Sequence, residues 1–287
     1  MTSTSDSTPA QAAPPSAPQA HRALGLPRSF VAHPAYGPLP GLLLILTAVT
    51  GVVDSISILA LGRVFVANMT GNVVFAGFAI VGAPGFSLSA SLFALAGFLV
   101  GAAAGGALIT RVGSDRAALL RAGTAAEVTL AAVALVLAAL SGDPGVTHGT
   151  IHLTAGAFGP AVTVALAAVL AAAMGIQNAV ARKLAVPDLT TTVLTMTLTG
   201  IGADLRAVLR SGATHGTAKS DLVRRLLAIG TMLAGAVAGA SLTLYVSPLS
   251  ALALALSLLA VTAAAAMAAA ARPAPWRTPS ARPRRGR

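Results

Sequence analysis

Asp54 is the residue whose type and place in this sequence most directly suggest chemistry. It lies inside the apolar stretch at residues 41–61, and inserting an unpaired carboxylate into a bilayer costs at least about 2.5 kcal/mol. A proton, a cation or hydrogen bonds must therefore compensate it. We expect Asp54 to couple protons or cations along a path through the membrane. The alternative is a structural role, in which Asp54 caps a helix break or lies near the outer surface beside Arg63.

The stretch ANMTGN at residues 67–72 supplies further polar side chains. If the chain enters the membrane extended and becomes helical near Asn68 and Thr70, these side chains cap the helix start, and its free N–H groups face the protein interior. Several transporters hold ions and solutes at paired helix ends of this kind. The alternative is helix packing, with Asn68 and Asn72 bonded across helices.

The second half of the chain offers matching residues. Asn178 in GIQN is the counterpart of Asp54 in GVVD, and Asp188 and Thr190 follow Pro187, a residue that ends helices. We predict that six polar residues from the two halves converge on one cavity near the membrane midplane, and that Asn72 and Gln177 complete the solute and ion path. The six are Asp54, Asn68, Thr70, Asn178, Asp188 and Thr190.

Other residues give weaker signals. Glu127, within the apolar stretch 117–140, either reaches a polar partner or marks a late start of that span, and we assign it no role. His148 and His152 have the spacing of two ligands on one helix face, but Gly145 and Gly149 favour an irregular loop, so we predict no metal site. The sequence has no cysteine and no Walker, GxSxG or glycine-rich phosphate motif, so we predict no cofactor and no enzymatic activity.

The composition indicates the class of protein in which these residues lie. Of the 287 residues, 55% are hydrophobic and 9% charged, and the mean hydropathy of +0.81 nearly excludes a soluble enzyme. The formal charge of +11 is concentrated in part at residues 272–287, which hold six Arg and no acid. A basic tail beside a membrane helix favours a cytoplasmic anchor on anionic lipid, and we predict no nucleic-acid binding.

The apolar stretches predict an all-α polytopic membrane protein. Seven are strong and one, at 189–203, is short and rich in threonine. The strong ones are 41–61, 65–83, 88–110, 117–140, 158–180, 226–246 and 249–271. Three short matches occur in the same order in both halves: GVVD with GIQN, TGNVV with TTTVL, and GAAAGGAL with GAVAGASL. These matches indicate an internal repeat, as in secondary transporters.

The glycines of the third match have the spacing of close helix crossings. Gly101 and Gly105 in the first half correspond to Gly235 and Gly239 in the second. Small residues four positions apart allow two helix backbones to approach each other. We therefore assign all four to helix packing.

Basic residues decide between two topologies. If 65–83 and 189–203 enter the membrane and return, six full spans remain, and every Lys and Arg except Arg63 lies on the side of the termini. The two halves are then inverted repeats, each with three spans and one re-entrant or broken helix. The alternative of eight spans exports Arg111, Arg116, Arg121, Arg182 and Lys183.

The six-span arrangement gives five regions and an orientation. We expect a disordered cytoplasmic tail at 1–37, a membrane repeat at 38–142, an external loop at 143–157, a second membrane repeat at 158–271 and a basic cytoplasmic tail at 272–287. The protein then lies in the plasma membrane with both termini in the cytoplasm.

The residues GVVDSISILALGRVFVANMTGN, GIQNAVARKLAVPDLTTT and TLTG resemble the YoaK-like family of uncharacterised bacterial membrane proteins, the domain of unknown function 1275, over about residues 40–270. That resemblance implies six spans and no known activity. Two functions remain. One is a transporter or channel for a small polar or ionisable solute, and the other is a non-transporting membrane scaffold or assembly partner.

Overall fold

The computed structural model describes residues 36–142, 157–186, 195, 197–202, 216–271 and 273–278, with side chains in the helix from 216 described from Leu222 onward. Every regular element in these residues is helical. The long helices are α2 (Leu39–Ala60), α4 (Leu88–Val112), α5 (Arg116–Leu140), α6 (Pro160–Leu184), α8 (Gly216–Tyr245) and α9 (Pro248–Ala270). Shorter elements are α3 (Met69–Ile80), the 3₁₀ helix η1 (Pro275–Arg277) and a helical segment at 197–202.

Within the part of the chain that the structure describes, six helices have the length and hydropathy of membrane spans, which confirms the six-span prediction. Helix α3 has 12 residues, or about 18 Å of rise, which is little more than half of a 30 Å hydrocarbon core. It begins at Met69, within the apolar stretch 65–83 and at the helix start expected near Asn68 and Thr70. The segment 189–203 lies outside the described residues except for the helical positions at 195 and 197–202.

Local signals in the sequence set the helix boundaries. The side chains of Ser87, Asp115 and Ser247 accept hydrogen bonds from backbone N–H groups in the first turns of α4, α5 and α9. Proline stands in the first turn of α2, α6 and α9, where its missing N–H group has no partner to lose. Gly113, at a φ of +73°, makes the turn between α4 and α5, a backbone conformation that glycine adopts without strain.

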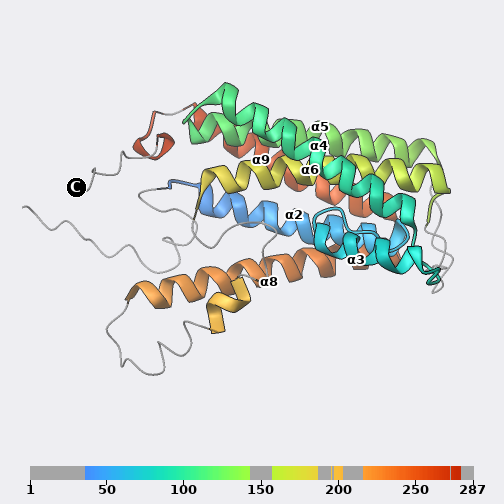
Figure 1. The fold of residues 1–287 in the computed structure, drawn as a ribbon. Coiled ribbons are helices and arrows are strands. Elements are labelled where there is room, and N and C mark those ends of the chain that lie inside the picture. Colours follow the sequence, from blue (N-terminus) through green and yellow to red (C-terminus); the bar gives the residue numbers. More distant parts are fainter. Residues whose placement is uncertain are drawn as a thin grey trace, which may run out of the picture.

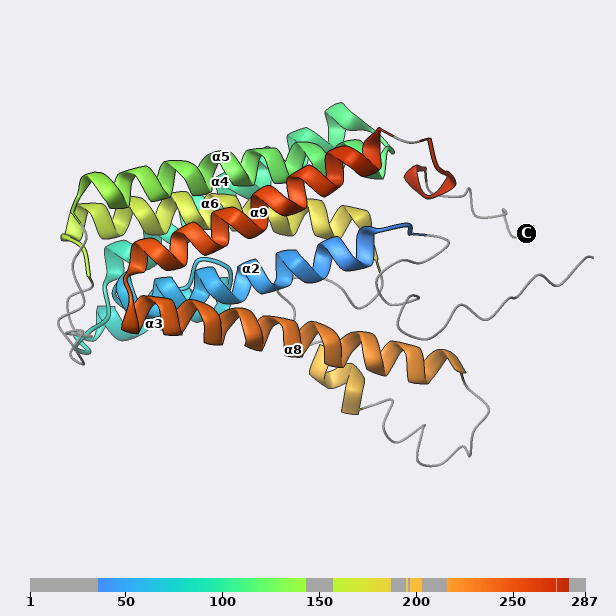
Figure 2. The same cartoon turned by 180° about the vertical axis from the view of Figure 1, so that it is seen from behind.

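The long helices run side by side in alternating directions (Figure 1). Helices α2, α5 and α8 run one way, and α4, α6 and α9 run back. We call the end with residues 36–39, 112–116 and 273–278 the Asp115 end, and the opposite end, where α3 lies, the α3 end. Helix α9 returns beside α2 and finishes at the Asp115 end (Figure 2).

Two helix pairs make the closest approaches, α4 with α6 and α2 with α8. A Cβ atom added at Gly101 of α4 would meet the backbone carbonyl of Ala172, and one at Gly235 of α8 would meet the carbonyl of Ala48. One turn further along α4 and α8, a second glycine of each helix makes the same kind of close contact. A Cβ atom at Gly105 would lie 2.7 Å from the Cβ of Ala179, and one at Gly239 would lie 2.8 Å from the Cα of Val52.

Helices α2 and α6, which face α8 and α4, carry glycines that make matching contacts. A Cβ atom at Gly51 of α2 would meet the carbonyl of Met232, and one at Gly175 of α6 would meet the carbonyl of Phe98. The contacts of Gly51, Gly101 and Gly105 thus have counterparts at Gly175, Gly235 and Gly239, whereas Gly97, which approaches the carbonyl of Ala168, corresponds to Thr231. In both pairs backbone touches backbone, which only glycine permits at these places.

Candidate functional site

Asp54 holds a non-helical segment against the side of α2. Its Oδ1 atom accepts a hydrogen bond from the backbone N–H of Ala67 at 3.2 Å. Asp54 lies six residues before Ala60, the last residue of α2, which is about 9 Å along the helix axis. The chain that leaves α2 at Ala60 therefore turns back to the depth of Asp54 before α3 begins.

Asn72 fixes the same segment from the other side. The side chain of Asn72 is fully buried. Its Nδ2 donates to the carbonyl of Phe65 at 2.6 Å and its Oδ1 accepts from the N–H of Phe65 at 2.8 Å. Non-helical backbone at this depth needs partners within the protein, and Asp54 and Asn72 supply them. The helix starts at Met69 because residues 65–67 make these bonds instead of helical ones.

The predicted capping role of Asn68 is wrong. Asn68 occupies the N-cap position of α3, but its side chain makes no capping hydrogen bond. Asn68 and Thr70 are both exposed, so their side chains point away from the helix start. Of the three polar residues singled out in this stretch, Asn72 orders the segment, and the other two face outward.

In the second half, Asn178 donates to the carbonyl of Met174 within its own helix at 2.9 Å. The hydrogen bond of the Asp54 carboxylate goes to Ala67 and not to Asn178. Asp188 and Thr190 lie outside the described residues, as do His148 and His152. Convergence of the six predicted residues on one cavity stays a prediction.

Gln177 links α6 to α2 in the protein interior. Its Nε2 donates to Thr50 Oγ1 at 2.9 Å and lies 3.4 Å from the carbonyl of Leu46. Both Gln177 and Thr50 are fully buried. The Gln177 Oε1 atom has no hydrogen-bond partner. The sequence pointed to Gln177 but not to Thr50, since a single threonine in an apolar helix usually bonds its own backbone.

Sequence reasoning gave Glu127 no role, yet its environment is the most unusual in the described chain. The side chain is fully buried in α5, and neither carboxylate oxygen has a hydrogen-bond partner. The available signal was the place of a carboxylate in the middle of an apolar stretch, which marks a functional candidate by default.

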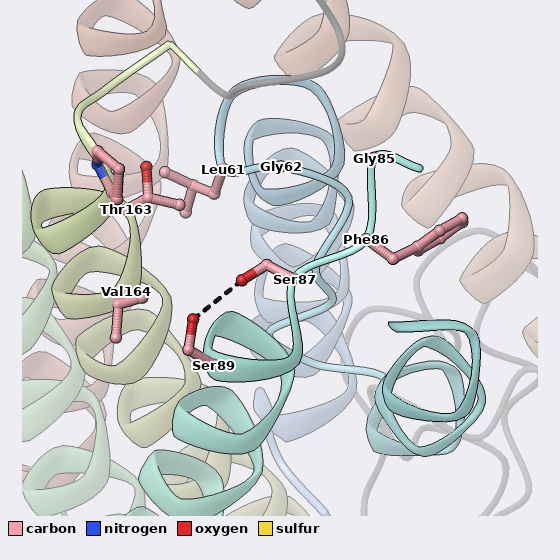
Figure 3. A pocket seen from close by; sticks show the side chains of 9 residues that line it. Leu61, Gly62, Gly85, Phe86, Ser87, Ser89, Thr163 and Val164 are labelled. Carbon is pink, nitrogen blue, oxygen red and sulfur yellow. Dashed lines mark hydrogen bonds between the residues drawn. The ribbon is translucent and has the colours of Figure 1, made fainter. Parts of the chain in front are cut away.

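A polar cavity of about 240 Å³ opens at the α3 end. It lies between the loop after α2, the start of α4 and the start of α6, and the hydroxyl groups of Ser87 and Ser89 lie 3.0 Å apart in it (Figure 3). Asp54, Asn68 and Asn178 do not line this cavity. Nearby, Phe75 lies 5.0 Å from Phe86 between ring centroids, and Arg63 lies over the Phe86 ring.

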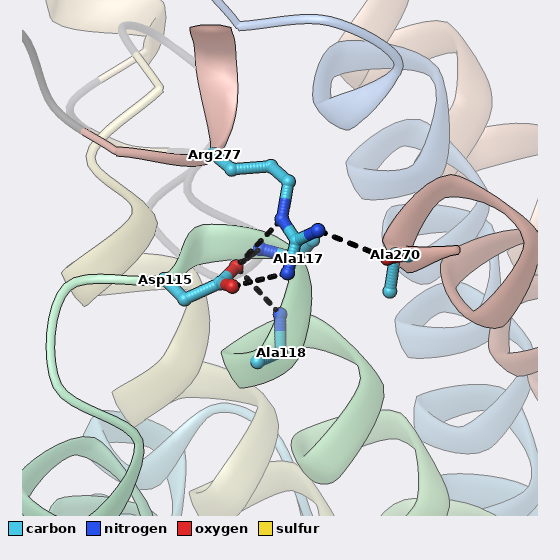
Figure 4. Close-up of polar contacts among 5 residues, drawn as sticks. All are labelled: Asp115, Ala117, Ala118, Ala270 and Arg277. Atoms are coloured by element: carbon cyan, nitrogen blue, oxygen red, sulfur yellow. Dashed lines mark hydrogen bonds and ion pairs between the residues drawn. The ribbon is translucent and has the colours of Figure 1, made fainter. Parts of the chain in front are cut away.

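The Asp115 end is closed by the segment after α9. Asp115 caps α5 through the N–H groups of Ala117 and Ala118 and forms an ion pair with Arg277, which also donates to the carbonyl of Ala270 (Figure 4). The hydrogen bond from Arg277 lowers the pKa of the Asp115 carboxyl, and the capped N–H groups lower it further. A cavity of about 330 Å³ lies beside this pair and reaches Lys183.

Comparisons with known proteins agree with this architecture. The model of a family described as "Protein of unknown function (DUF1275)" matches residues 42–265. A relative, the UPF0700 transmembrane protein YoaK of Bacillus subtilis (strain 168), is 33% identical over 196 residues, which cover 68% of this chain and 80% of the relative. No solved structure matches this chain. With six apolar helices of spanning length and a family match over most of its length, this multi-pass membrane protein belongs to the DUF1275 family.

Proposed function

We propose that this protein is a transporter or channel for a small polar or ionisable solute in the plasma membrane, and that Asp54 and the start of α3 line its path. The hydrogen bond from Ala67 to Asp54 carries this proposal. It brings a helix start with free N–H groups about 9 Å inside the span, where such groups attract the electronegative atoms of a solute.

The exposure of Asn68 and Thr70 supports a water-filled path. Both lie next to the segment that Asp54 holds, well inside the span, and both are exposed. Polar side chains facing lipid at that depth are unfavourable, whereas a water-lined crevice satisfies them. On this proposal, Gln177 and Asn178 belong to the path from the second half, with Asp188 and Thr190 at its matching helix break.

The matched glycine contacts support two inverted repeats. The contacts of α4 on α6 and of α8 on α2 occur at corresponding positions, and the corresponding helices run in opposite directions (Figure 1). In many transporters, the interface of two such repeats holds the substrate and one repeat moves against the other.

The charge at the two ends supports an orientation. Among the described residues that end or follow a span, Arg111, Arg116, Arg182 and Lys183 lie at the Asp115 end, while Arg63 is the basic residue at the α3 end. The positive-inside rule therefore places the Asp115 end and both termini in the cytoplasm. There the basic tail at 272–287 would meet anionic lipid.

The test is current measurement on a solid-supported membrane carrying proteoliposomes of the full chain. The probes are concentration jumps of glycine, lactate, methylammonium and inorganic phosphate. We expect at least one probe to give a current that Asp54→Asn abolishes. The matched control is Asp115→Asn, the same chemical change in a carboxylate outside the spans, which should keep the current.

Two results would contradict the proposal. One is a current that Asp54→Asn and Asp115→Asn leave equally unchanged. The other is wild-type protein that behaves like protein-free vesicles with every probe, which would favour the non-transporting scaffold.

A further inference from the structure

The carboxyl side chain of Glu127 is positioned to bind a proton inside the membrane. It is the twelfth residue of the 25-residue helix α5, so it lies near the middle of the span. Its side chain is fully buried and its two carboxylate oxygens have no donor. A carboxylate without any partner at such a place would cost many kcal/mol if it were ionised, and such groups bind a proton instead.

A second buried acceptor without a donor lies at the same level of the bundle. A Cβ atom at Gly123 would lie 2.8 Å from the side chain of Val180 on the antiparallel helix α6. One turn further along α5, Glu127 is level with residues 176 and 177 of α6. Gln177 is fully buried there, and its Oε1 atom has no donor. A proton on Glu127 supplies an O–H donor at a level of the bundle where two buried acceptors have none.

Charged groups on the surrounding elements lie too far away to neutralise Glu127. Helix α9 contains no charged residue, and the charged residues of α6 and α4 are Arg182, Lys183 and Arg111, all exposed and near the Asp115 end. On α5 itself, Arg121 is exposed and six residues away, or about 9 Å along the axis. In η1, Arg277 is paired with Asp115.

We propose that Glu127, at the level of Gln177 and Thr50 in the bundle, is the proton-coupling site of this protein. The inference rests on the proposed transport function. A proton from water on one side of the membrane binds the Glu127 carboxylate, and the neutral carboxyl group is then buried in the bundle, where the structure has this side chain. The proton returns to water on the other side when a conformational change exposes the site.

A proton fits this site better than a metal ion does. Hard cations take six or more oxygen ligands in proteins. The polar side chains that the contacts and helix register bring near this level are one carboxylate, the Gln177 amide and the hydroxyls of Thr50 and Thr124, and the Thr124 hydroxyl donates to the carbonyl of Leu120 at 2.9 Å. The Thr50 hydroxyl already accepts from Gln177 and donates to the carbonyl of Leu46 at 3.0 Å. One carboxylate and one free amide oxygen are enough to hold one proton between them.

Infrared spectroscopy of the full chain in lipid bilayers tests the site without relying on transport. A protonated carboxyl group has a C=O stretch separate from the bands of ionised carboxylates. We expect wild-type protein at neutral pH to show this band and Glu127→Gln to lack it. Asp115→Asn, which changes an exposed carboxylate, should keep it. Glu127→Asp, which retains the carboxyl group, should show the band at a shifted frequency.

The expected difference requires folded variants, so each is first compared with wild type in its thermal unfolding. Gln at position 127 offers both a donor and an acceptor, as the protonated carboxyl does, and should fold normally. A protonated-carboxyl band with the same intensity in Glu127→Gln as in wild type, or one that is absent from wild type, overturns the proposal. A sodium-dependent loss of the wild-type band would overturn it in favour of a metal ion.

The transport measurement separates this inference from the proposed function. With a probe that gives a current, Glu127→Gln should abolish accumulation driven by a pH gradient while solute exchange across the bilayer continues. A normal infrared result combined with no wild-type current would contradict the transport proposal and leave the proton site in place. Accumulation by Glu127→Gln equal to that of wild type would contradict the coupling role.

Discussion

The two halves of the molecule share their packing and differ in their polar residues. Gly51 and Gly175 make equivalent backbone contacts, as do Gly101 and Gly235. At matching positions, however, Asp54 stands opposite Asn178 in the sequence match, and Gln177 opposite Val53. These glycine contacts are therefore present in both halves, while the Asp54 carboxylate corresponds to the amide of Asn178 in the second half.

This difference shows what each set of residues is constrained to do. A side chain at Gly101 or Gly235 would meet a backbone carbonyl of the facing helix, so any residue larger than glycine is costly at both positions. A charged or amide side chain in the interior is costly and is useful where it binds something. Asp54 meets part of that cost by accepting a hydrogen bond from the N–H of Ala67, and the transport measurement tests whether it also binds a solute or an ion.

The largest expected effect concerns the orientation of the halves, and the two ends of α5 report it. Ser114 and Ser141 flank this helix, both are exposed, and the natural chain has no cysteine. In intact cells, we expect an impermeant maleimide to label Ser141→Cys fully and Ser114→Cys not at all. Permeabilised cells should label both, which is the control for reactivity.

Reversed labelling would contradict the inverted arrangement with cytoplasmic termini. An eight-span chain with its N-terminus in the cytoplasm places Ser114 outside and Ser141 inside. The same pair of variants therefore also tests the number of crossings before α5.

The next largest effect tests whether the two interfaces are equivalent. Gly101→Ala and Gly235→Ala each place a methyl group against a backbone carbonyl, that of Ala172 or of Ala48. We expect each to lower the free energy of unfolding by roughly 1–3 kcal/mol, measured by thermal unfolding in detergent micelles. Similar losses at both positions would support the equivalence of the halves, and a loss at one alone would break it.

Matched controls lie on the same two helices. A Cβ atom at Gly106 of α4 or Gly230 of α8 would have open space around it. Gly106→Ala and Gly230→Ala should therefore cost nothing and could add up to about 1 kcal/mol through higher helix propensity.

Most of the helical architecture could be predicted from the sequence because hydrocarbon thickness fixes the length of a span. The stretches 88–110 and 117–140 differ from α4 and α5 by a few residues at most. Helix α8 begins well before the predicted start at 226. The residues before the apolar stretch include Lys219, Arg224 and Arg225, and lysine and arginine favour helix although they are not apolar. Hydropathy marks where a helix can meet lipid, and helical structure can extend past that point.

The site was less predictable because hydrogen-bond partners depend on how the chain returns. The place of Asp54 in an apolar stretch indicated that it needs a partner, and the structure supplies the backbone N–H of Ala67. No pattern in the sequence distinguishes that partner from Asn178. Glu127 carried the same signal as Asp54, but its full burial depends on the packing of several helices around α5.

The smallest expected effect is at the Asp115 end, where the second half returns to cover the first. Trp276 is the single tryptophan, and its ring lies over Gly37, where a Cβ atom would be 2.6 Å from ring atoms. Its fluorescence therefore reports whether the segment with η1 is docked. The Asp115 and Arg277 side chains are 30% and 27% exposed, so solvent screens their ion pair, and we expect it to contribute less than about 1 kcal/mol to docking.

The pKa of Asp115 sets the pH at which this docking weakens. Arg277 lowers that pKa, so the docked state binds fewer protons than the undocked state as the pH falls. The contribution of the ion pair to docking is therefore fully present above about pH 4, the ordinary value for an aspartate, and is lost as acidification passes through the lowered pKa of Asp115. Trp276 emission should shift to longer wavelength over that range in wild type.

Asp115→Asn should show the shift at neutral pH already, with little further change on acidification. Asp115→Ala should also lose about 1 kcal/mol of unfolding free energy, because it removes the α5 cap. Unchanged emission in Asp115→Asn would mean that the packing of Trp276 on Gly37, and not the ion pair, holds the segment in place.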